Sequence, residues 1–178
     1  MKSDVIRIDS NGGGFEQTQE EIEKFSSFNG LSQKETLHLQ LLKEEMLSLI
    51  RSLTGQMQSL LWIEGENRAF ELHLQTEAVM DKDTRALLLS ASSSRKNEAA
   101  KGFLGKLRDS LERALAADHP SDYEQIIPQE VWYDIPADYV DESGWDGYER
   151  SILRRLSDEV KISIRGKSVD VIVIKSFR

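Results

Sequence analysis

The end of the chain carries the pattern that most restricts its fold. Apolar and polar residues alternate from 160 to 164, residues 165–167 (Arg-Gly-Lys) follow as a turn, and residues 169–174 are almost entirely β-branched or apolar. Alternation with a period of two is typical of a strand with one buried face, and the longer apolar run fits a strand buried on one or both faces. The sequence therefore predicts that the chain ends in a β-hairpin.

The first part of the chain predicts a strand, two helices and a second hairpin. A β-branched run at 5–8 predicts the first strand, and residues 59–63 and 70–74 predict two more around a turn at 64–67. Thr18 and Glu21 have the spacing of a capping box, which predicts a helix that begins there and ends at Asn29-Gly30. The same spacing at Ser32 and Glu35 predicts a longer helix, which runs to about Leu53.

The middle of the chain predicts a helical insert followed by an irregular loop. Asp83 is placed to cap a short helix, residues 92–97 form a polar, serine-rich break, and leucines recur at helical spacing up to about Asp118. All three prolines and many aromatic residues fall between 119 and 147. We expect a single α/β domain over 1–178: a two-layer sandwich with a mixed, mostly antiparallel sheet, helices on one face, an insert at about 82–118 and a lid-like loop at about 119–147.

Composition excludes several classes of protein. Lys and Arg total 23 against 31 Asp and Glu, a net charge of −8, which argues against binding to a nucleic-acid backbone. There is no cysteine, so disulfides and thiolate sites are excluded. No apolar run approaches the roughly 20 residues of a membrane span, and the first residues lack the apolar stretch of a signal peptide. We expect a soluble, cytoplasmic protein that does not bind nucleic acid or membranes.

Familiar site motifs are missing. The three histidines are far apart and show no metal-ligand spacing, so no metal site is predicted. The glycines at 12–14 stand between a predicted strand and a helix, where backbone amides can hold phosphate, but they lack the spacing of a nucleotide-binding loop. We interpret them as structural.

The acidic, aromatic stretch within the predicted loop is open to two interpretations. Its rings can stack on a ligand or insert into a pocket of a partner protein. Alternatively, they close one end of a small core, since large rings are mostly buried. If the stretch is an interaction loop, the residues that carry it are Trp132, Tyr133, Tyr139 and Trp145.

Three stretches, 42–51 (LKEEMLSLIR), 148–160 (YERSILRRLSDEV) and 162–174, resemble a known family in their order and patterning. The chain resembles the histidine-kinase-like ATPase superfamily (GHKL or Bergerat fold), and within it the branch of anti-sigma factors and serine-protein kinases. The first stretch is similar to the helix that carries the family's N-box, and the other two to the elements after its ATP lid. The resemblance covers nearly the whole chain. It implies a bacterial signalling role, a sigma factor or signalling regulator as partner, and a homodimer.

The family's site is degenerate in this sequence. Glu45 stands where the resemblance places the catalytic Glu, but Leu49 replaces the magnesium-binding Asn, and Leu offers no oxygen to a hard cation. A register shifted by one would pair Glu44 with Ser48, whose hydroxyl is a poorer substitute. Thr76 stands near the position of the adenine-reading Asp, without the glycines that follow it in the family.

The lid of the family is also reduced here, to Gly144 and Gly147 among acidic residues that would repel a triphosphate. Because phosphoryl transfer depends on positioning and charge neutralisation, we expect a non-catalytic regulatory protein, a pseudo-ATPase without cofactor. The alternative is an ATP-binding protein or serine kinase, in which Glu45, Thr76, Gly144 and Gly147 hold ATP and magnesium. A second alternative is a small-ligand binder that uses the aromatic loop.

Overall fold

In the part of the chain that the structure describes, five antiparallel strands form one sheet in the order β1-β2-β3-β5-β4. The structure, a computed structural model, describes residues 1–54, 58–100 and 152–178. The two hairpins of the sheet, β2–β3 and β4–β5, meet along β3 and β5 in its interior. The strands are β1 (Ile6–Asp9), β2 (Gln58–Glu66), β3 (Ala69–Glu77), β4 (Glu159–Arg165) and β5 (Ser168–Ser176). Both predicted hairpins are therefore present, but the described sheet contains no parallel pair, so it is antiparallel and not mixed.

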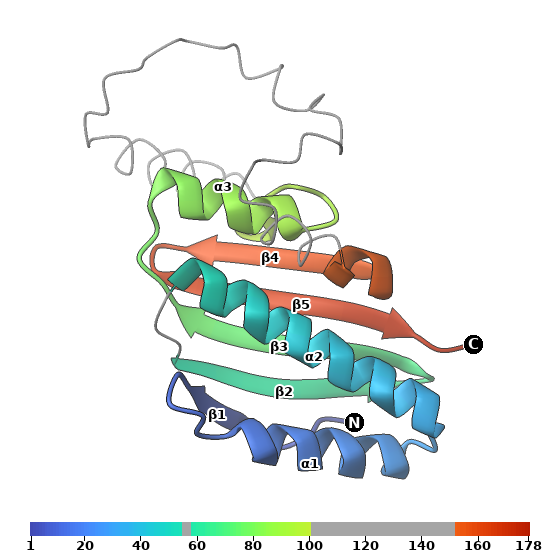
Figure 1. Ribbon diagram of the computed structural model, residues 1–178. Helices are drawn as coiled ribbons and strands as arrows, with labels where there is room; N and C mark the ends of the chain where they lie inside the picture. Colours follow the sequence, from blue (N-terminus) through green and yellow to red (C-terminus); the bar gives the residue numbers. More distant parts are fainter. Residues whose placement is uncertain (55–57, 101–151) are drawn as a thin grey trace, which may run out of the picture.

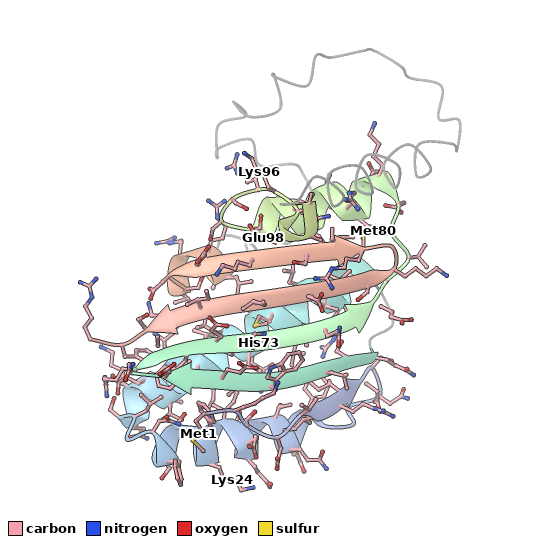
Figure 2. All side chains as sticks on the ribbon, turned by 180° about the vertical axis from the view of Figure 1, so that it is seen from behind. Met1, Lys24, His73, Met80, Lys96 and Glu98 are labelled. Carbon is pink, nitrogen blue, oxygen red and sulfur yellow. The ribbon has the colours of Figure 1, made fainter. Side chains whose placement is uncertain are left out.

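Helices cover one face of this sheet. Figure 1 shows α2 (Gln33–Thr54) lying across it, α1 (Phe15–Phe28) beside β1, and α3 (Lys82–Ala91) next to β4. A single 3-10 turn follows at Glu98–Ala100, and residues 152–156 are helical. Seen from behind, the sheet lies in front of the helices, with its other face turned to the viewer (Figure 2). The chain thus has the predicted two-layer α/β sandwich.

The core lies between the sheet and α2. Alternate residues of every strand point into it, among them Leu72 and Val171, which are fully buried. Helix α2 meets them with the apolar stripe predicted from its sequence, and these residues are at most 2% exposed: Leu39, Leu42, Met46, Leu49 and Ile50. Burial of this stripe explains why α2 takes a fixed place on the sheet.

Of the three helix caps predicted from the sequence, one is confirmed and two are wrong. At α2 the capping box is present: the Ser32 amide donates to Glu35 Oε2 at 2.7 Å. Thr18 instead lies inside α1, which begins at Phe15, and its hydroxyl donates to the Phe15 carbonyl. The cap of α3 is Asp81, whose carboxylate accepts from Thr84 N at 2.7 Å, and not Asp83.

Candidate functional site

Thr76, which the ATP-binding alternative would place at the nucleotide, is part of the sheet. It lies near the end of β3 on the helix-covered face and is only 3% exposed. Its hydroxyl donates to the Gln58 carbonyl on β2 at 2.9 Å. The proton that would be offered to an adenine ring is therefore used to join two strands.

On α2, Leu49 stands where the family resemblance places the magnesium-binding Asn, and its side chain is part of the core. Leu49 is 2% exposed, while Glu45 and Ser48 are partly buried. Lys43 is the unexpected residue of this helix: it is 1% exposed, and its ammonium lies 2.5 Å from Glu44 Oε1 at the surface. Burial of a charge requires a paired partner, and Glu44 supplies one. Its carboxylate is thereby occupied in an ion pair, which leaves the shifted register Glu44–Ser48 without a free acid.

The remaining predicted site residues lie outside the described residues. This applies to the lid glycines, Gly144 and Gly147, and to the aromatic loop with Trp132, Tyr133, Tyr139 and Trp145. The part of the predicted insert beyond Ala100 lies outside them as well. Of the predicted nucleotide site, only the α2 and β3 positions can thus be placed.

The glycine loop before α1 is built for close packing. Gly14 has φ of +83°, and a Cβ atom there would lie 2.1 Å from the Arg7 carbonyl oxygen. The Asp9 carboxylate accepts hydrogen bonds from the amides of Asn11 and Gly13, at 2.8 and 3.0 Å. Two of the amides that an anion would need are thus already paired within the loop, in agreement with a structural role.

A groove runs between α1 and α2 on the side away from the sheet. Its volume is about 380 Å³, and its lining combines polar and apolar side chains: Glu23, Ser27, Leu31, Gln33, Thr36, Leu37 and Gln40. Leu37 is 57% exposed, and Leu41, one turn further along α2, is 44% exposed. Phe28, next to Ser27 in the sequence, is 79% exposed. We name this surface, the groove with Leu41, the α1–α2 groove.

Helix α1 is acidic, and one of its Glu residues, Glu23, lines the groove. Four Glu residues and a single Lys fall within this helix. Glu23 Oε1 accepts from Gln40 Nε2 across the groove at 3.1 Å and from Gln19 Nε2 at 3.0 Å, which fixes its carboxylate there. The groove thus pairs exposed leucines with negative charge. The sequence signal that could have predicted this surface is the position of Leu37 and Leu41, which fall outside the buried stripe of α2.

The open face of the sheet carries a second cluster. The Trp62 and His73 rings are stacked across β2 and β3, and the Lys2 ammonium lies 4.7 Å from the centre of the indole. Glu64 accepts from Trp62 Nε1 at 2.9 Å and pairs with Lys2 at 3.0 Å. Burial lowers the pKa of His73 below its usual value, although Glu64 and Glu71 oppose this shift. Figure 2 shows His73 in the middle of this face.

Within the described ranges, no group of three or more His, Asp or Glu residues could hold a metal ion. None of the described helices is long and apolar enough to cross a membrane.

A scan against protein-family models and searches of curated proteins and of solved structures return no match.

Proposed function

We propose that this protein is a non-catalytic regulator that acts by binding another protein, on a degenerate histidine-kinase-like ATPase fold. The observation that carries the proposal is the α1–α2 groove, where exposed Leu37 and Leu41 adjoin an acidic helix. Exposed apolar side chains rimmed by polar ones are typical of protein-interaction sites. The proposed occupant is an amphipathic helix of the partner, with apolar anchors at i, i+3 and i+4 and basic residues beside them.

Charge complementarity selects this occupant. Helix α1 carries four Glu and one Lys, and the whole chain has a net charge of −8. A basic helix would be attracted to α1 and an acidic one repelled. A sigma factor or another signalling regulator remains the partner class that the family resemblance implies.

The state of the nucleotide positions supports the non-catalytic part of the proposal. The Thr76 hydroxyl donates to a strand carbonyl, Leu49 is buried in the core, and Glu44 is held in an ion pair with Lys43. None of these three groups is available to hold ATP or its magnesium ion. The alternative, an ATP-binding protein or serine kinase, requires Glu45 to act with residues outside the described part of the chain.

A calorimetric titration of the full chain with ATP and magnesium separates the two functions. We expect no binding tighter than about millimolar, since the divalent ion lacks its oxygen ligand. Micromolar binding that is lost in Glu45→Ala or in the isosteric Thr76→Val would establish the alternative function and overturn the non-catalytic proposal.

The groove is tested with two model helical peptides of equal leucine content, one flanked by lysines and one by glutamates. With ¹⁵N-labelled protein we expect the basic peptide to shift amide resonances of the groove residues, and the acidic peptide to leave them unchanged. Leu37→Gln should weaken this binding at least about tenfold, because an exposed apolar anchor is lost. Val79→Gln is the matched control, since Val79 is 80% exposed and lies between β3 and α3. Equal binding by the two variants would contradict the assignment of the groove.

A further inference from the structure

The outer edge of β4 is closed by a short segment that is not a strand. Residues 92–97, which we name the strap, follow α3 and lie along this edge. The Ser93 amide donates to the Val160 carbonyl at 2.9 Å, and the Ser93 hydroxyl accepts from the Val160 amide at 2.8 Å. Figure 2 shows Lys96, within the strap, and Glu98, just after it, beside this edge of the sheet.

The side chain of Asn97 binds the backbone at the other end of β4. Its side-chain amide donates to the Ile164 carbonyl at 2.9 Å, and its side-chain oxygen accepts from the Ile164 amide at 2.8 Å. Asn97 is only 7% exposed. The strap therefore satisfies the edge mainly with two side chains, one at each end, where a neighbouring strand would use a continuous series of backbone bonds.

The strand behind the strap is complementary to itself. Its sequence is Glu-Val-Lys-Ile-Ser-Ile-Arg from Glu159 to Arg165. The bonds to the strap show that Val160 and Ile164 direct their backbone groups outward, and the period of two places Ile162 with them. An antiparallel pairing of two copies centred on Ile162 joins Val160 to Ile164 of the second copy, so that every outward amide meets a carbonyl.

The same register pairs opposite charges. It places Glu159 directly opposite Arg165 of the second copy, and Lys161 opposite Ser163 of the second copy. Directly opposed, oppositely charged side chains stabilise an antiparallel pair, whereas like charges destabilise it. Because the pairing is symmetric, each favourable contact occurs twice.

We propose that the outer edge of β4 is a latent interface for a second copy of this chain, opened when the strap withdraws. The two sheets would then continue into each other through paired β4 strands. Exposed strand edges readily pair with another chain, and natural proteins cover them for this reason. The strap thus decides whether the protein is a monomer or a strand-paired dimer, through a surface separate from the α1–α2 groove.

The first test removes the side-chain bonds of the strap. Sedimentation velocity over a range of concentrations should show a monomer for the unmodified protein and a dimer for Ser93→Ala/Asn97→Ala. Ser94→Ala is the matched control, because the Ser94 hydroxyl contacts Lys96 and Glu98 and not β4. If the double variant proves too unstable to fold, Ser93→Ala alone is used. It removes the hydroxyl that accepts from the Val160 amide, and it should strengthen dimerisation at least about threefold over the unmodified protein. A folded strap variant that remains monomeric up to millimolar concentration would overturn the proposal.

The second test identifies the surface by charge. Two charge reversals are made separately in the strap variant. Glu159→Arg places arginines at both 159 and 165, so that like charges face each other across the dimer, and Arg165→Glu does the same with glutamates. Each change should weaken dimerisation of the protein that carries it at least about tenfold. A mixture of these two proteins restores opposite charges at both contacts and should form a heterodimer. Dimerisation that is unaffected by either change, or a mixture that remains monomeric, would overturn the proposal.

Discussion

The indole ring of Trp62 lies parallel to the imidazole ring of His73, with 4.8 Å between the ring centres and 4° between their planes. The His73 side chain is 13% exposed, and its Nε2 lies 3.3 Å from Glu71 Oε2, a contact that is an ion pair only when the ring is protonated. Burial disfavours the charged imidazolium more than the nearby Glu64 and Glu71 carboxylates favour it, so the pKa of His73 is lowered.

We predict that the protein loses stability as the pH falls through the region where free histidine titrates. The pKa of His73 is lowered by burial, so the unfolded chain takes up this proton at higher pH than the folded chain does. The free energy of unfolding should therefore decrease from above pH 6.5 down to the folded pKa of His73, and this contribution should then level off. Urea unfolding at several pH values measures this change in the free energy of unfolding. His73→Gln should remove the part of the pH dependence that comes from His73. An NMR titration that gives His73 a pKa above 6.5 would contradict the prediction.

The glycines before α1 should respond very differently to alanine. In Gly14→Ala the new Cβ would overlap the Arg7 carbonyl and the residue would keep a left-handed φ, so we expect a loss of at least about 2 kcal/mol. Gly12 has φ of +91° but no atom within 4 Å of such a Cβ, so Gly12→Ala should cost only about 1 kcal/mol. Denaturant unfolding of both variants provides the comparison. Equal losses would show that the close approach at Gly14 is unimportant.

The cap of α3 gives a third prediction. Asp81→Ala should destabilise the protein by roughly 1 kcal/mol, because it removes the acceptor of the Thr84 amide, whereas Asp83→Ala should change little. The same hydrogen bond lowers the pKa of Asp81, so its contribution is present above the unfolded value and is lost as the pH falls through the folded pKa. Thermal unfolding at pH 7 and pH 3 distinguishes the two variants. A larger loss for Asp83→Ala would place the cap there.

Changing one partner of the Lys43–Glu44 ion pair should affect stability differently from changing the other. Glu44→Gln leaves the buried ammonium without its carboxylate, and we expect a loss of about 1–2 kcal/mol, less than for a fully buried pair because Glu44 is 56% exposed. Lys43→Met removes the buried charge and should be close to neutral or stabilising. In the Lys43→Met background, Glu44→Gln should have little further effect. A double-mutant cycle of unfolding free energies tests all three expectations.

Local patterns in the sequence accounted for much of the fold. Both hairpins followed from alternation and turn residues, and the start of α2 followed from the capping box at Ser32. Asp81 and Asp83 show the limit of this reasoning, because either carboxylate could have capped α3, and the structure begins the helix at Lys82 with Asp81 as its cap.

The features that the sequence did not reveal depend on distant partners. Ser93 and Asn97 read as part of a polar break, but their hydrogen bonds join positions 67 residues apart. Lys43 would normally be placed on the solvent side of a helix, yet it is buried. No periodicity within α2 or the strap encodes these contacts, because they arise only when the sheet and the helices come together.

The pairing of β3 with β5 also bears on how the chain reaches this structure. Each hairpin closes between neighbouring segments, whereas Glu77 must find Ser168 across about 90 intervening residues, a separation that slows folding. The two halves of the sheet should consequently form quickly and join late. Until they join, the apolar edges of β3 and β5 are exposed to other chains, so refolding at high concentration should favour aggregation, and dilution should favour recovery of the native protein.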